Sequence, residues 1–294
     1  MTVNDPVREF LMTRRAKVQP EDVGLPRGAR RRVRGLRREE VAALAGVSGE
    51  YYVQIERGEL AGVSDEVLLA VARALRLNEA ETSHLLDLAR AKTRRPSRTR
   101  RTTRPTVVPV AVQALLDAMV GAISVVQDGR LDLVATNALG RAFYTEAFDG
   151  TDRRPNLARY VFLDPRSRDF FPDWDRAADD VAAMLHVEAG RAPYARELTD
   201  LVGELATRSA EFRTRWAAHD VRLHRTGIKR VRHPEVGDMV LQYAGLEVPE
   251  AAGLVVYGYT PARDETRTVE ALRLLASLAA TTVRSAEVPV TDSW

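Results

Sequence analysis

Residues 49–57 carry side chains whose types and spacing could read the edges of DNA base pairs. A glutamine can bond both edge atoms of adenine and a glutamate can accept from cytosine N4, so Gln54 and Glu50 are candidate base readers. Helical spacing places Tyr52 and Ile55 inward with Val47. The opposite face presents Gly49, Glu50, Val53, Gln54 and Arg57. The stretch predicts a helix that offers small and polar residues to a major groove.

The residues before this helix supply the partner helix and the turn that hold it. In REEVAALAGVSGEYYVQIERG, residues 38–58, an apolar stripe of Val41, Leu44 and Ala45 ends at Gly46, which tolerates a tight turn. Ser48 is then a good N-cap for the second helix. An ordinary helical hairpin is the alternative, but hairpins rarely combine a small turn, an N-cap and a polar outer face. We therefore predict a helix-turn-helix.

The flanking sequence predicts three further helices. Asp5 and Pro6 open one with a core face of Val7, Phe10, Leu11 and Arg14; Ser64 opens another; an Asn78–Glu81 capping box opens the last. The pattern REEVAALAGVS…IERG resembles the second helix, turn and recognition helix of the XRE (lambda-repressor-like) family. The resemblance implies an all-α DNA-binding domain in which Glu56 pairs with an arginine of the first helix, matched here by Arg14.

Charge divides the chain into a basic and an acidic part. Residues 1–108 hold 22 basic and 14 acidic residues, a net of +8, whereas the remainder carries −5. A basic half suits DNA and an acidic half avoids it. With no cysteine, disulfides and thiolate metal sites are excluded. Because no apolar run approaches a membrane span and no signal peptide is apparent, we expect a cytoplasmic protein with no membrane partner.

Several basic residues are candidates for phosphate contact. Ser48, Arg37, Arg38 and Arg57 border the two helices of the motif. A run of Arg30, Arg31, Arg32 and Arg34 could form an arm that contacts phosphates or enters the minor groove, or it could be a solvated loop. Residues 92–108 have no apolar face and predict an extended basic linker.

The sequence after Pro109 predicts an α+β domain. Strands are expected at 123–127 and 131–136 around an Asp-Gly-Arg turn, then helices at 137–147, 156–163, 174–189, 195–208 and 211–219. Strands return at 221–225, 229–233, 239–246 and 254–259, before a helix at about 266–284. This order indicates a PAS-like fold, an antiparallel sheet covered by helices that enclose an apolar space.

Long segments of this domain resemble a second family. RRPNLARYVFLDPRSRDFFPDWDRAADDVAAMLHVEAGR and SAEFRTRWAAHDVRLHRTGIKRVRHPEVGDMVLQYAGLEV look like the MmyB-like ligand-binding domain, which follows an XRE-type helix-turn-helix in that family. The resemblance implies a multidomain one-component transcriptional regulator with domains at 1–91 and 109–285, a linker at 92–108 and a tail at 286–294. It also implies a long-chain fatty acid or similar amphipathic ligand as effector, with no other cofactor.

The residue types and their spacing do not decide where a ligand would bind in this domain. Phe212, Trp216 and His219 share one helix face, where His219 or Arg215 could meet a carboxylate head group. Predicted ligand contacts are Phe143, Phe162, Phe212, Arg215, Trp216, His219 and Tyr243, and Phe170, Phe171, Trp174, Met184 and Leu185 could line the same space. All of these could equally form solid core.

Two other functional classes compete with the sensor. His219, His224 and His233, with Asp220 and Asp238, are the richest cluster for a metal-dependent enzyme, but they lack the spacing of a zinc helix and no phosphate loop or nucleophile elbow is present. We expect no enzyme. In the other class the second domain serves only dimerisation or protein interaction. We expect a DNA-binding homodimer, because such proteins read two half-sites about 34 Å apart.

Overall fold

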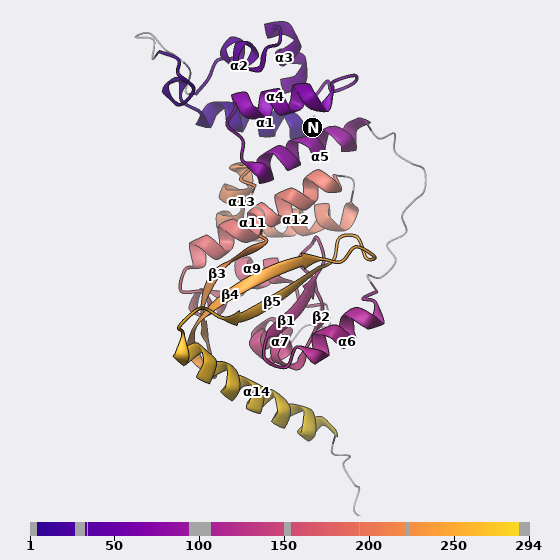
Figure 1. Ribbon diagram of the computed structural model, residues 1–294, viewed down its shortest axis with the longest axis vertical. Coiled ribbons are helices and arrows are strands. Elements are labelled where there is room, and N and C mark those ends of the chain that lie inside the picture. The colour runs from indigo at the N-terminus through magenta and orange to yellow at the C-terminus, as the bar shows by residue number, and fades with distance from the viewer. Residues whose placement is uncertain are drawn as a thin grey trace, which may run out of the picture. The chain divides into compact units, whose positions relative to one another are not determined.

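The computed structural model describes residues 5–26, 33, 35–93, 107–149, 154–193, 195–221 and 224–287 (Figure 1). The chain forms two compact units. The first comprises Met1–Arg100, His186–Val202 and Arg213–Leu223, and the second comprises Arg101–Leu185, Gly203–Phe212 and His224–Trp294. No helix among the described residues is long and apolar enough to cross a membrane.

The predicted five-helix domain lies in the first unit. It consists of α1 (Pro6–Lys17), a short 3-10 helix (Pro20–Val23), α2 (Arg38–Ala45), α3 (Gly49–Glu56), α4 (Asp65–Ala74) and α5 (Glu79–Thr93). The predicted caps are present: Asp5 accepts from Val7 N at 3.0 Å, and Asn78 and Glu81 bond each other's backbone N–H groups. These caps satisfy backbone groups that a helix start leaves without partners.

One core holds the five helices together. Phe10, Leu11, Tyr52 and Ile55 are all at most 1% exposed, so α1 and α3 bury the faces that their spacing predicts. The predicted stripe of α2 is wrong at one position. Leu44 is 40% exposed, whereas Val41 and Ala42 are buried. Val41 is in the core as predicted and Ala45 packs against it half-buried, while Ala42 is buried in place of Leu44.

A buried carboxylate joins the first three helices. Glu56, 2% exposed, accepts from Arg15 Nε of α1 at 2.8 Å and from Arg38 Nε of α2 at 3.0 Å. The predicted pairing of Glu56 with Arg14 is wrong. The guanidinium of Arg14 pairs with Glu81 of α5 at 3.0 Å. Adjacent helical residues point about 100° apart, so Arg14 faces α5 while Arg15 faces α3.

The second unit contains a five-stranded antiparallel sheet of order β2-β1-β5-β4-β3. The strands are β1 (Ile123–Gln127), β2 (Leu133–Thr136), β3 (Thr226–His233), β4 (Gly237–Glu247) and β5 (Val255–Pro261). The helices are α6 (Val110–Ala118), α7 (Ala138–Phe143), α8 (Thr145–Phe148), α9 (Leu157–Leu163), α10 (Ser167–Phe170), α11 (Trp174–Arg191), α12 (Arg196–Arg208), α13 (Ala210–Ala217) and α14 (Thr266–Glu287). The predicted α+β class is confirmed.

Two predicted strand boundaries are wrong. The described residues between 221 and 225 form no strand, because the ladder with β4 begins at the pair Thr226–Ala244. Leu131 is not part of β2, since its φ of 66° lies in the left-handed region, outside strand geometry. The predicted helix at 137–147 is divided into α7 and α8 at Tyr144.

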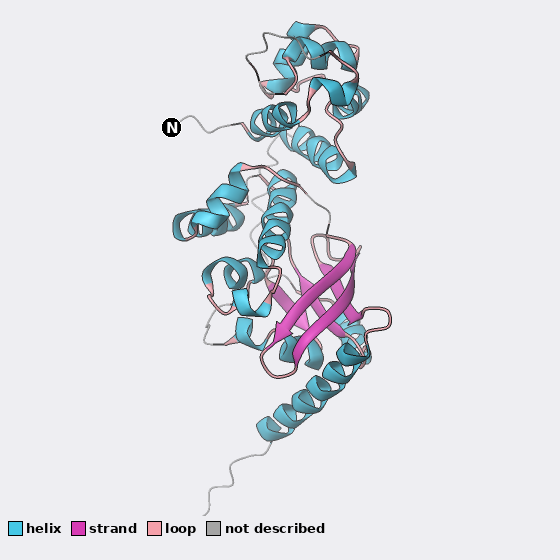
Figure 2. Ribbon diagram, turned by 90° about the vertical axis from the view of Figure 1, so that its left-hand side faces the viewer, coloured by secondary structure: helices cyan, strands magenta, loops and turns pink. Residues whose placement is uncertain are grey.

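The two faces of the sheet are covered differently, and most helices lie on one side of it (Figure 2). Over the other face, α6 packs Leu116 against Val126 and Val256, so β1 is buried on both sides. β3 and β4 alternate between buried and exposed residues, with Val231 and Leu241 inward and Arg230 outward. This alternation fixes which side chains of β3 face the helices.

The Glu56 cluster predicts a measurable loss of stability. Burial raises the pKa of Glu56, but hydrogen bonds and charge from Arg15 and Arg38 outweigh it and hold the pKa below the usual value. Glu56→Gln should cost about 3 kcal/mol, because two arginines lose their carboxylate. Glu59→Gln, at an exposed position, is the matched control. Thermal melting of both variants measures the difference.

The same pKa shift fixes the pH dependence. A carboxylate with a depressed folded pKa stabilises the fold above its unfolded pKa, and that contribution is lost as pH falls through the folded value. Wild-type melting temperature should therefore drop below about pH 4 more steeply than that of Glu56→Gln. Parallel acid curves for the two proteins would contradict a charged, buried Glu56.

Candidate DNA interface and ligand cavity

The start of α3 has the geometry that the sequence predicts for a reading helix. Gly46 ends α2 at a φ of 70°, a left-handed turn that side chains rarely adopt. Ser48 caps α3, and its Oγ accepts from Tyr51 N at 3.1 Å. Tyr52 and Ile55 anchor the inner face, so the rigid core fixes the direction of the outer face. This arrangement is that of a helix-turn-helix.

The outer face of α3 presents the predicted base readers. Glu50 and Gln54 are exposed, while Val53 is half-buried; Arg57, a predicted phosphate contact, is also exposed. At Gly49 an added Cβ would meet nothing within 4 Å, so the first turn is open to an approaching surface. A short polar helix end held away from its core is what a major groove accommodates.

The arginines predicted to contact DNA phosphates differ in their exposure and in the partners that they already have. Arg37 is exposed at the start of α2, beside the N-terminal end of the motif. Arg38 is half-exposed but directs its guanidinium to Glu56, so its first role is structural. The arm residues Arg30, Arg31, Arg32 and Arg34 lie outside the described residues.

The predicted ligand residues are not brought together. Phe143 lies in an aromatic cluster with Tyr144, Phe170 and Tyr259, whose ring centroids are 4.8–6.0 Å away. Phe162 packs on Phe212 at 5.0 Å. Arg215, Trp216 and His219 belong to the first compact unit, where Trp216 stacks on His186 at 3.7 Å. Of the seven, only Tyr243 lines the cavity described next.

A cavity of about 330 Å³ lies in the second unit between the sheet and α11. Strand register places Gln127, Lys229, Tyr243 and Tyr259 on the same face of the sheet. The wall opposite comes from α11. The cavity is lined by Phe171, Asp173, Arg176, Ala177, Asp180, His224, Ile228, Lys229, Arg230 and Tyr243. Its volume falls within the range of small-molecule sites.

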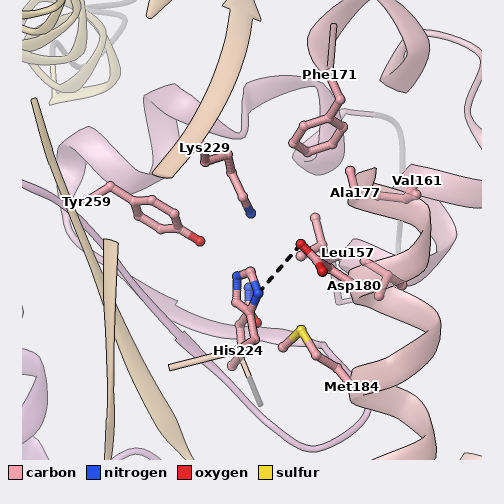
Figure 3. Close-up of a pocket in the computed structure, with 11 residues that line it drawn as sticks. Leu157, Val161, Phe171, Ala177, Asp180, Met184, His224, Lys229 and Tyr259 are labelled. Carbon is pink, nitrogen blue, oxygen red and sulfur yellow. Dashed lines mark ion pairs between the residues drawn. The ribbon is translucent and has the colours of Figure 1, made fainter. Parts of the chain in front are cut away.

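Lys229 lines both this cavity and a smaller hollow beside it, where its ammonium points toward Asp180 of α11 (Figure 3). Its Nζ lies 5.5–5.7 Å from the ring centres of Phe171, Tyr243 and Tyr259. Among the described residues it makes no hydrogen bond or ion pair. Burial lowers the pKa of Lys229 to about 8, opposed by the charge of Asp180. The cavity therefore contains a cation held by aromatic faces and a distant carboxylate.

His224 forms the floor of the same space. Its ring stacks on Tyr243 at 4.3 Å, its Nδ1 is hydrogen-bonded to the Tyr243 hydroxyl at 3.0 Å, and the same nitrogen lies 3.9 Å from Asp180 Oδ2 (Figure 3). Burial, with the positive charges of Lys229 and Arg176, lowers the pKa of His224 to about 3. At neutral pH the ring is uncharged, so Asp180 remains a counter-charge for Lys229.

A smaller hollow of about 20 Å³ lies alongside the cavity, shares several of its lining residues, and holds about one water. Leu157, Val161, Met184 and Tyr259 give it apolar walls, but Gln127 also lines it. Gln127 is 2% exposed, and its Oε1 has no hydrogen-bond partner among the described residues. A buried acceptor without a partner is costly, so this atom favours a donor arriving from outside the chain.

Sequence reasoning missed Lys229, Asp180 and Gln127. It named Phe171 and Met184 as residues that could line a ligand space, and both do. A signal for Lys229 was present: it shares the inward register of β3 with Val231 and His233, positions that otherwise hold buried side chains. A lysine in an apolar register is a candidate for a site.

The histidines considered for a metal site do not meet. His233 Nε2 is hydrogen-bonded to the Ala142 carbonyl at 3.1 Å, whereas His224 faces the cavity and His219 belongs to the first unit. Within the described residues no group of three or more His, Asp or Glu side chains could hold a metal ion.

Two family profiles match the chain. The MmyB-like transcription regulator ligand binding domain matches residues 108–275, more than half of the 294 residues. A helix-turn-helix domain matches residues 27–85, which contain α2, α3 and α4. No curated protein matched the sequence.

The exposed face of α3 yields a prediction about base reading. Gln54→Ala should weaken binding to the preferred DNA site by about 1–3 kcal/mol and change the preference at one base step per half-site, since the bidentate contact is lost. Binding-site selection followed by titration of the selected and altered sites measures both effects. An unchanged base preference would exclude Gln54 as a reader.

Arg57 should behave differently from Gln54. As an exposed cation at the end of α3, it can contact a phosphate but carries no base information there. Arg57→Ala should weaken all sequences alike and reduce the slope of log affinity against log salt by about one unit. DNA-binding titrations at several salt concentrations measure this slope. If Arg57→Ala has the same slope as wild type, Arg57 does not contact a DNA phosphate.

Proposed function

The chain belongs to the MmyB-like transcription regulators, and we propose that it is a one-component sensor of the XRE type that binds a specific operator and responds to a small effector. A DNA-binding regulator with a ligand-binding domain is the function of the matched families. The observation that carries the sensor is the cavity in the second unit, where a lysine without an ion pair faces three aromatic rings.

We propose an apolar or amphipathic effector, and a fatty-acid-like molecule is the chemistry to test first. Phe171, Ile228 and Tyr243 of the cavity, with the apolar walls of the adjoining hollow, offer contacts to an apolar body. Lys229 and Arg176 offer positive charge to an anionic head group on the cavity wall. The residues proposed to contact it are Phe171, Lys229 and Tyr243, in place of Arg215, Trp216 and His219.

We propose that the regulator acts as a homodimer. Two copies of α3 would read two half-sites of an operator about one DNA turn apart. An exposed apolar side chain of α14, Leu274, is 51% exposed and is a surface that a second copy would bury in such a dimer. Light scattering should give a mass near twice 32.7 kDa, and a monomer that still binds two half-sites tightly would contradict the proposal.

The effector is expected to change operator affinity. A ligand shifts DNA binding only if it prefers one state of the protein, and such couplings typically amount to about 5- to 150-fold. Operator affinity of the full chain should therefore change by at least about fivefold with saturating dodecanoic acid at fixed salt. Lys229→Met should lose this change, whereas Arg232→Ala, on the exposed face of β3, should retain it.

Calorimetry on the same samples separates binding from signalling. If dodecanoic acid binds but leaves operator affinity unchanged, the ligand is a structural passenger and the sensor proposal fails. If no apolar ligand binds and the chain still dimerises through its second domain, that domain serves assembly instead.

A further inference from the structure

Lys229 is unusual within this sequence. Only three of the 44 basic residues are lysines, namely Lys17, Lys92 and Lys229, and all the others are arginines. Lys17 pairs with Asp220 and Lys92 pairs with Asp5. Lys229 alone of the three has no carboxylate within ion-pair distance among the described residues. An arginine would supply charge to this cavity equally well, but only a lysine amine can lose its proton and act as a nucleophile near neutral pH.

The surroundings of Lys229 suit an uncharged amine. Its Nζ faces the rings of Phe171, Tyr243 and Tyr259, and the nearest opposite charge is Asp180. Burial lowers the pKa of Lys229 to about 8, so a substantial share of the amine is neutral near that pH. Burial lowers the pKa of His224 to about 3, so its ring is neutral and supplies no charge to Lys229.

We propose that Lys229 is a covalent capture site, whose amine condenses reversibly with the aldehyde or ketone group of an apolar effector to form an imine. The inference rests on the proposed effector site and names the reactive group of its ligand. Three features carry it: a lysine on the inward face of β3 without an ion pair among the described residues, a cavity of about 330 Å³ that gives access, and the rings of Phe171, Tyr243 and Tyr259 around its amine.

The reaction balances without any further reactant. The amine lone pair of Lys229 attacks the carbonyl carbon, and a proton moves from nitrogen to oxygen to give a carbinolamine. Loss of the hydroxyl group with a second nitrogen-bound proton forms C=N and releases one water, with no change of oxidation state. The hollow of about 20 Å³ that Lys229 also lines can accept a water of that size.

Two polar groups suit the adduct. Asp180, which already acts on Lys229 through its charge, would stabilise the positive charge of the protonated imine. Gln127 Oε1, buried without a partner, would accept a hydrogen bond from the released water or from a hydroxyl of the effector.

Reductive trapping tests the imine on the full-length protein. The probe is dodecanal with cyanoborohydride, which converts an imine into a stable secondary amine. Intact mass and peptide mapping should give one dodecyl group per chain, on Lys229, with at least about tenfold less on Lys17, Lys92 or the N-terminal amine. The trapping rate at Lys229 should rise through its pKa of about 8 and level off only about one pH unit above it, where the amine is largely neutral.

Matched variants separate the site from general lysine chemistry. Lys229→Arg keeps the charge but cannot condense, so it should show no adduct in the cavity, whereas Lys92→Arg should label like wild type. Circular dichroism melting checks that both are folded. Dodecanoic acid should slow labelling of Lys229 by competing for the same cavity, and urea should abolish the preference among the three lysines.

The outcomes distinguish this inference from the proposed function. Equal labelling of all lysines, or none at Lys229 in folded protein, overturns the imine, and a dodecanoic acid effect on operator affinity would then leave the sensor proposal standing. Labelling confined to Lys229 supports the imine even if operator affinity is unchanged, in which case the sensor proposal fails alone.

Discussion

Buried charge is the constraint on which the helical part of this protein depends. Glu56 sits at the end of α3 with almost no exposure, and a carboxylate there is tolerable only because Arg15 and Arg38 both donate to it. One arginine comes from α1 and the other from α2, so three helices must be placed together for the charge to be satisfied. That arrangement and the buried side chains of Tyr52 and Ile55 fix the direction in which the exposed face of α3, with Glu50 and Gln54, points.

The α+β unit treats a buried charge in the opposite way. Lys229 enters the space between sheet and α11 without an ion pair among the described residues, beside a glutamine oxygen that also lacks a partner. The buried carboxylate of Glu56 has hydrogen-bond donors within the chain, because Arg15 and Arg38 both bond to it. Lys229 and Gln127 are left for something outside the chain to satisfy, and such unsatisfied groups are typical of functional sites.

The two sites differ in how they can be coupled. The start of α3 is capped by Ser48 within the chain, whereas in the proposal above an effector would supply the contacts that Lys229 and Gln127 lack among the described residues. Free energy gained from those contacts can alter DNA binding only by favouring one state of the protein over another. The same cavity could therefore serve as a sensor with different effectors, provided that each satisfies the lysine.

The sequence by itself determined the local elements of this protein. Caps at Asp5, Ser48 and Asn78, the turn at Gly46 and the outward set on α3 follow from residue type and spacing, because these interactions span at most a few positions. The α+β class and most strands were also predictable, from short runs of β-forming residues and turn signals between them. Only the tertiary structure decided the partners across long separations, such as Arg15 instead of Arg14 for Glu56, and the place of the cavity. Lys229, Asp180 and Gln127 meet because sheet register and the packing of α11 bring them together, and no short-range pattern encodes that packing.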